Sequence, residues 1–265
     1  GYYEWRDRPV SATQRWRDEL GDIIEVLFAD SDGTYGYRRI HADLQRAGRP
    51  CDPQTVRVLM AERGLVACQP RPRGPRTTIP AASGALPDLV NRDFTADEPG
   101  LKLVGDITYI PTWQGWVYLA TVLDCCTKKV VGYAMAEHMR TELVVDALKM
   151  AIINGHTRHG ETIFHSDRGT QYMSAEFAEF TRDAGIVRSV GRTGICYDNA
   201  WAESFNATLK VERVHRTVYP TRRHAIGDIA RYIELRYNQR RLHSALQYRT
   251  PNEAEQDWYE TNKAA

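Results

Sequence analysis

The sequence has few cysteines and no long apolar run, and these absences exclude several classes of protein. Its five cysteines are an odd number, form no C-x-x-C pair and do not fall at zinc-finger spacing with the eight histidines. No window approaches ~18 uninterrupted apolar residues, and residues 1–6 lack the apolar stretch of a signal peptide. We therefore expect a cytoplasmic protein with reduced thiols, no structural zinc and no membrane contact.

Net charge is also almost absent, at +1 over 265 residues, but the charge is unevenly distributed along the chain. Residues 188–249 contain 12 basic and 5 acidic residues, whereas residues 99–187 contain 8 basic and 10 acidic residues. A basic strip beside an acidic centre suits a metal-dependent enzyme that acts on a phosphodiester backbone. A solvated charged helix face would give similar counts.

Turn residues and composition divide the chain into four predicted parts. Residues 10–68 carry apolar residues at helical spacing in three short runs, which is typical of a helix-turn-helix module or of a plain three-helix packing domain. Residues 69–98 form a basic, proline-rich linker. Residues 99–215 form the predicted catalytic core, and residues 216–265 a basic helical C-terminal segment.

Within the core, the pattern predicts strands and helices that form one layered α/β sheet. Runs rich in Val, Ile, Tyr and Thr, separated by turn residues, indicate three antiparallel strands, and helical spacing alternates with short buried strands afterwards. The expected elements are strands over 103–110, 116–124 and 128–135, a helix over 142–153, a strand over 162–165, a helix over 174–184, a strand over 186–190 and a helix from 197 to about 215.

Three carboxylates lie at positions that suggest a role in chemistry. Asp106 lies in the middle of an apolar strand, where an isolated charge is costly unless it is paired or bound to metal. Asp167 follows a buried strand, at the edge where open α/β sheets assemble their sites. Glu203 falls on a helix, with Lys210 two turns further along nearly the same face.

Together these acids offer the hard oxygen ligands that Mg²⁺ or Mn²⁺ prefers. Two such ions could activate the attacking oxygen and neutralise the leaving oxygen of a phosphoryl transfer. Each acid alone has an ordinary interpretation: Asp106 as a hairpin residue, Asp167 as a helix-cap acid and Glu203 as a solvated helix carboxylate.

The order Asp, Asp, Glu, with 35 residues between the last two, resembles the signature of transposases and retroviral integrases with a ribonuclease H-like core. Further strings resemble the second-frame part of insertion-sequence-three family transposases over nearly the whole chain. These strings are Asp106-Ile107-Thr108-Tyr109-Ile110, Val131-Gly132-Tyr133-Ala134-Met135, His165-Ser166-Asp167-Arg168-Gly169, Tyr197-Asp198-Asn199-Ala200 and Glu203-Ser204-Phe205, with Tyr35-Gly36-Tyr37-Arg38-Arg39-Ile40 upstream and a segment from Tyr237-Asn238 to Pro251.

The resemblance implies a mixed five-stranded sheet with flanking helices, and a DNA transposase that cuts element ends and joins the freed 3′-hydroxyl to another phosphodiester. It implies that Asp106, Asp167 and Glu203 are the catalytic metal ligands for two Mg²⁺ or Mn²⁺ ions, and that Lys210 holds a phosphate of the terminal DNA. It also implies that the element circularises through a bridged junction before it integrates. Other polar residues of the matched motifs and of the basic strip are expected to contact DNA: His165, Arg168, Asn199, Arg213, Arg240 and Arg241.

The sequence departs from the family pattern in two respects. Gly105 stands where the family commonly has Thr, and the chain has no heptad run of the kind that forms a leucine zipper. A homo-oligomer on DNA is expected nevertheless, because transposition chemistry usually requires one. Two alternatives stay open: a nuclease that cleaves without joining, and a DNA-binding regulator without metal-dependent cutting.

Overall fold

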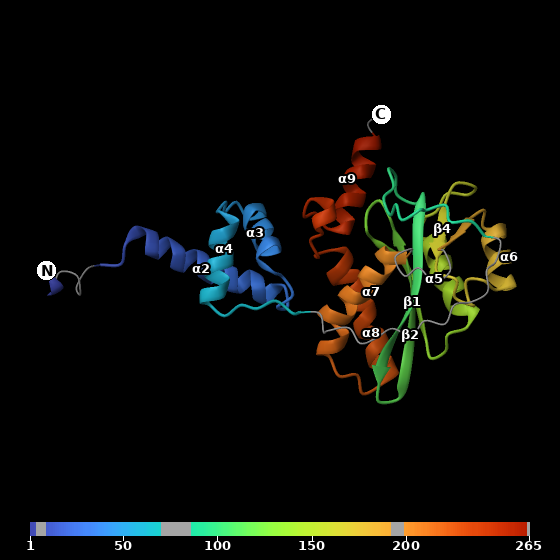
Figure 1. The fold of residues 1–265 in the computed structure, drawn as a ribbon, viewed down its shortest axis with the longest axis horizontal. Coiled ribbons are helices and arrows are strands. Elements are labelled where there is room, and N and C mark those ends of the chain that lie inside the picture. The colour runs from blue at the N-terminus through green and yellow to red at the C-terminus, as the bar shows by residue number, and fades with distance from the viewer. Residues whose placement is uncertain (4–8, 70–85, 192–198, 264–265) are drawn as a thin grey trace. The chain divides into compact units, whose positions relative to one another are not determined.

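The computed structural model describes residues 1–3, 9–69, 86–191 and 199–263, which fall into two compact units, residues 1–70 and residues 71–265 (Figure 1). Within these described ranges, no helix is long and apolar enough to cross a membrane. The division between the units, after residue 70, falls within the expected linker of residues 69–98. Most of this linker, residues 70–85, lies outside the described residues, whereas residues 86–98 belong to the second unit.

The first unit is built from the three helices that the sequence predicts. Ser11 and Asp52 cap two of them by accepting hydrogen bonds from the backbone N–H of Gln14 and Gln54, at 3.1 and 2.8 Å. The apolar positions of all three helices form one small core, from Leu20, Ile24, Ile40, Leu44, Val56, Leu59 and Met60. The helices are α2 (Ala12–Asp30), α3 (Tyr37–Arg46) and α4 (Pro53–Glu62).

The second unit contains a mixed five-stranded sheet, as predicted. The strand order is β3-β2-β1-β4-β5, in which β1 pairs antiparallel with β2, and β4 and β5 continue parallel to β1. Its strands are β1 (Lys102–Thr112), β2 (Gly115–Asp124), β3 (Val130–Ala136), β4 (Ile163–Ser166) and β5 (Val187–Val190).

Helices cover both faces of this sheet. Side chains alternate between the faces along each strand, so apolar residues at successive positions need a helix on either side. Leu103 packs in the cluster with α5 (Thr141–Ile153) and α6 (Ala175–Asp183), whereas Val104 packs in the opposite cluster with α7 (Ala200–Glu212) and α8 (Arg222–Arg231). Gly132 permits the close approach of α5 to β3, since a Cβ there would lie 2.2 Å from the carbonyl oxygen of Ala147.

The C-terminal segment packs on the core in the same unit. After α8 the chain widens into a π-helix (Tyr232–Asn238), and it ends in α9 (Pro251–Lys263). The Asn238 side chain accepts a bond from the backbone N–H of Val130 and donates one to its carbonyl, both at 3.0 Å, so it completes the edge of β3. The helix expected to reach about residue 215 ends instead at Glu212, and a 3₁₀ turn follows (Val214–Arg216).

Candidate active site

Asp106 lies within β1, and Asp167 directly follows β4, the neighbouring strand. The parallel pairing of β1 with β4 sets Val104 opposite His165, and each acid stands two residues further along its own segment. This register brings the two acids close enough for the charge of Asp167 to act on Asp106.

Helix α7 carries the third acid. Ala202, Phe205 and Leu209 are buried in the cluster on the face of the sheet that α7 covers, and Glu203 lies on the adjoining side of the helix. One helical turn after Glu203, the Nδ2 of Asn206 donates a 2.9 Å hydrogen bond to the Oδ2 of Asp106. The third acid and the first are therefore held together by α7 itself.

The electrostatics show that these acids are close neighbours. Burial first, and then the negative charges of Asp167 and Glu203, raise the pKa of Asp106 to about 7, against hydrogen bonds from the backbone of Ile107 and from Asn206 that lower it.

The surroundings of Asp167 follow the same pattern. Burial raises the pKa of its carboxyl although the residue reaches solvent, and a 2.9 Å bond from the backbone N–H of Gly169 and the charge of His165 oppose this. Tyr172 lies beneath the acids and is buried. Its pKa is well above the usual value, through burial first and then the charges of Asp106 and Asp167.

The three acids fit a divalent cation in ligand type and in charge. Carboxylate oxygens are the ligands that Mg²⁺ and Mn²⁺ prefer, and a dication would offset the repulsion that raises the pKa of Asp106. Among the described residues, however, no three His, Cys, Asp or Glu side chains converge tightly enough to enclose an ion. Both oxygens of Asp106 accept protein hydrogen bonds instead, from Ile107 and Asn206.

Lys210 extends the site along α7, as its spacing from Glu203 predicts. Its Nζ lies 4.6 Å from the ring centroid of Tyr109, which is on β1 three residues beyond Asp106. The cation is thus placed beside the strand that carries the first acid.

Three residues that the sequence analysis expects to contact DNA are bonded to other parts of the protein instead. His165 is fully buried, and its Nδ1 lies 2.8 Å from the Oγ of Ser189. The structure therefore corrects the expectation that His165 contacts DNA, because no surface of the ring is exposed. Asn199 is also buried, and its Nδ2 donates a 3.0 Å bond to the carbonyl of Gly105, which anchors the start of α7 on β1. Arg168 donates through Nε to the carbonyl of Gly191 at 2.8 Å.

The predicted strip of arginines is divided by burial. Arg241 is buried and donates to both carboxylate oxygens of Glu212 at 2.7–3.0 Å, so the expected phosphate contact is replaced by an internal ion pair. Arg213 donates to both oxygens of Asp228, with the Nε bond at 2.7 Å. Arg240, by contrast, is exposed.

Sequence reasoning missed Asn206. It is buried and touches the first acid, and its Oδ1 has no hydrogen-bond partner among the described residues. Its spacing of three residues from Glu203, between the buried Phe205 and Leu209, was the available signal.

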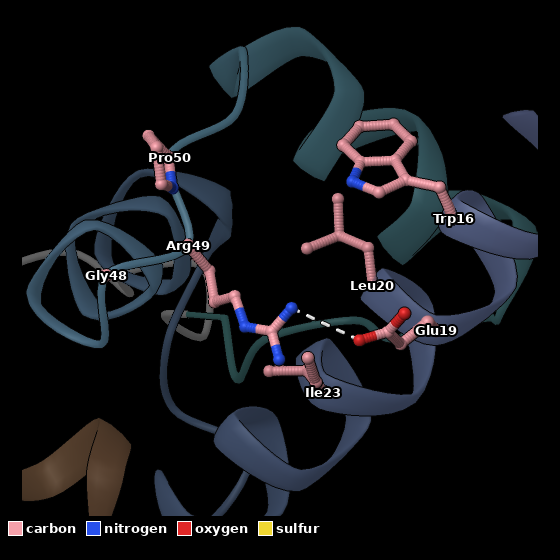
Figure 2. A pocket seen from close by; sticks show the side chains of 7 residues that line it. All are labelled: Trp16, Glu19, Leu20, Ile23, Gly48, Arg49 and Pro50. Carbon is pink, nitrogen blue, oxygen red and sulfur yellow. Dashed lines mark hydrogen bonds and ion pairs between the residues drawn. The ribbon is translucent and has the colours of Figure 1, made fainter.

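A pocket occurs in the first unit, and Figure 2 shows its lining. It lies between α2 and the turn after α3, with the indole of Trp16 near one end and an ion pair between Arg49 and Glu19 at 3.1 Å. Its remaining lining is apolar or backbone, so it offers no set of acids or nucleophiles for catalysis.

Comparison with known proteins agrees with this architecture. An integrase core domain model matches residues 96–196, a second integrase core domain model matches residues 184–251, and an HTH-like domain model matches residues 15–73. The chain is 37% identical over 248 residues to the transposase for insertion sequence element IS904 of Lactococcus lactis, covering 94% of this chain and 98% of that protein.

It is 35% identical over 246 residues to transposase InsF for insertion sequence IS3A of Escherichia coli, covering 92% of this chain and 85% of that protein. Among solved structures, the simian T-cell lymphotropic virus intasome in complex with PP2A regulatory subunit B56 gamma aligns with a TM-score of 0.50 at 15% identity, over 81% of this chain and 70% of that chain. That likeness shows a shared integrase-type fold.

Proposed function

This chain belongs to the IS3 family of bacterial insertion-sequence transposases with an integrase core, and from that premise we propose that Asp106, Asp167 and Glu203 are its catalytic acids and hold two Mg²⁺ or Mn²⁺ ions. One observation carries the assignment. Asp106 on β1 and Asp167 just after β4 stand two residues beyond the same paired position of these parallel strands, and Asn206 ties the helix of the third acid to the first.

The reaction follows from this arrangement in two displacements. Water attacks a phosphodiester at the element end, which leaves a free 3′-hydroxyl on one fragment and a 5′-phosphate on the other. That hydroxyl then attacks a second phosphodiester, so one P–O bond forms as another breaks and the displaced strand leaves with its own 3′-hydroxyl. Bound divalent ions supply activation of the attacking oxygen and neutralisation of the leaving one.

The protein's own groups position these partners. Asn206 directs one oxygen of Asp106, and Asn199 fixes the start of α7 against β1. Lys210 is a point charge suited to a phosphate of the terminal DNA, since an ammonium group cannot ligate a metal cation. Water exclusion is partial, because Asp167 reaches solvent.

DNA is the partner of both units in this proposal. The first unit matches an HTH-like domain, and Arg57 on α4 is exposed on its surface. Arg240 is exposed on the second unit and can follow a phosphate backbone. A homo-oligomer assembles on the paired element ends.

The test is strand transfer with the element's junction DNA and Mg²⁺, with nicked and joined products resolved on a denaturing gel. Asp106→Asn, Asp167→Asn and Glu203→Gln each remove a metal ligand at nearly constant volume, so each should abolish both products. Glu179→Gln is the matched control, because Glu179 is an exposed acid on α6.

Retention of more than roughly a tenth of the wild-type transfer by one acid variant would remove that residue from the site. Nicking without joining by the wild type would identify a nuclease. Binding to the ends without any metal-dependent product would identify a DNA-binding regulator.

A further inference from the structure

The hairpin of β1 and β2 exposes aromatic rings further along the strand that carries Asp106. Tyr109, Trp113 and Trp116 are 53%, 77% and 47% exposed, although aromatic side chains are usually the first to be buried. The pairing of β1 with β4 ends at Val104, whereas the pairing of β1 with β2 continues to Thr112. The outer half of β1 therefore projects with the hairpin, as the long strands in Figure 1 show.

Two of these rings are already arranged with a cation. Tyr109 and Trp116 lie edge to face, with centroids 4.9 Å apart at 80°, and the Nζ of Lys210 lies 4.6 Å from the centroid of Tyr109. We call Tyr109, Trp116 and Lys210 the hairpin platform. Tyr109 is three residues from Asp106 on the same strand, about 10 Å along it at the rise of an extended chain, and this odd spacing turns its ring to the opposite face of β1 from the Asp106 carboxylate.

We propose that the hairpin platform stacks an unpaired base of the DNA strand near its cut end, while Lys210 meets that nucleotide's phosphate. This inference rests on the proposed function, because it assigns a binding site for the DNA that the acids act on. Aromatic faces with an adjacent ammonium group match a nucleotide, because its base offers a flat π-face and its phosphate, joined to the base through the sugar, carries a negative charge.

An unpaired base fits better than a paired one. In a duplex each base is covered on both faces by its neighbours, so a protein ring can stack only on a base that has left the helix or lies at a single-stranded end. Such stacking tolerates any base, which suits rings on the hairpin that carries Asp106 and not in a recognition helix.

A second copy of this chain is the other occupant to consider. Apolar rings could bury one another across a dimer interface, but the platform includes a lysine, and a self-complementary contact would bring like charges together. Charge and the position of Tyr109 on the strand of Asp106 both favour the nucleotide.

The experiment measures affinity for oligothymidylate and for a blunt duplex of arbitrary sequence by fluorescence anisotropy, on the full chain in EDTA. Trp116→Leu and Tyr109→Leu should weaken oligothymidylate binding by about tenfold and duplex binding by less than about twofold. Tyr109→Phe keeps the ring and should bind like the wild type. Tyr259→Leu is the control, because Tyr259 is 40% exposed on α9.

Unchanged oligothymidylate affinity in both leucine variants would overturn the proposal. Equal weakening on oligothymidylate and duplex would do the same, as would a change of sedimentation from oligomer to monomer with unchanged affinity, which would assign the rings to a second copy. Asp106→Asn separates this test from the proposed function: it should keep oligothymidylate affinity and lose strand transfer. Retained transfer in that variant would refute the acid assignment and leave the platform result standing.

Discussion

Replacing Arg241 tests whether the basic strip serves DNA binding or folding. Its guanidinium and the carboxylate of Glu212 are 7% and 6% exposed, and the two side chains form a bidentate pair. The hydroxyl of Tyr232 donates a further 2.8 Å bond to the same carboxylate. The pair joins the end of α7, the helix of the third acid, to the C-terminal segment.

The expected magnitude follows from this burial. Arg241→Met leaves the Glu212 charge buried, with the Tyr232 hydroxyl as its remaining partner among the described residues, and breaking a buried pair from one side costs about 3–5 kcal/mol. That is a large part of a typical free energy of unfolding of ~5–15 kcal/mol. Adding Glu212→Leu removes the stranded charge, so the double variant should be more stable than Arg241→Met alone, although the Tyr232 hydroxyl then loses its acceptor.

The assay is urea unfolding of the full chain, followed by circular dichroism and by tryptophan fluorescence. Arg240→Met is the matched control, because the adjacent arginine is exposed, and it should change the free energy of unfolding by less than about 0.5 kcal/mol. The reasoning fails if Arg241→Met costs less than about 1 kcal/mol, or if the double variant is no more stable than the single one.

Four further changes have defined outcomes. Lys210→Ala should weaken binding of end DNA and leave Mn²⁺ affinity, measured by calorimetry, unchanged; equal loss of both would place the lysine among the acids' supports. Arg240→Ala should flatten the log–log salt dependence of duplex binding by up to about 0.9, and an unchanged slope would exclude a phosphate contact. Asp228→Asn should destabilise the protein near neutral pH, because the pKa of Asp228 is lowered in the folded state: burial raises it, but hydrogen bonds from Arg213 and Tyr219 outweigh burial. The difference in stability from the wild type should shrink as the pH falls below the ordinary carboxyl pKa of 3.8. A pH-independent difference in thermal unfolding would contradict this. Gly105→Thr should lower the melting temperature, since a Cβ there would lie 2.3 Å from the ring of Phe164, and Phe164→Leu in the same chain should restore part of it.

Local patterns in the sequence were sufficient for much of the fold. Strand alternation and helix spacing depend on neighbours a few positions away, so the meander of three antiparallel strands, β1–β2–β3, was predicted and is present. Local side-chain caps fix two of the later helices, since Ser174 accepts a bond from the N–H of Phe177 and Thr221 one from that of His224.

The three acids could also be chosen from the sequence, because each stands at an unusual place within its own element. Asp106 interrupts an apolar strand, Asp167 directly follows one, and Glu203 lies in the first turn of a helix. Their spacing carried the resemblance to the family that the comparisons confirm. Their catalytic roles stay predictions, to be settled by the strand-transfer assay.

The charge pattern of the sequence could not predict which arginines face solvent and which are buried. Arg241 finds Glu212 across 29 positions, and Asn206 finds Asp106 across 100, so neither partner could be read from a local window. His165 looked like a polar residue of the site motif, yet the sheet buries it fully against Ser189. Pairing and burial of polar groups depend on which distant segments pack together, and only the tertiary structure decides that.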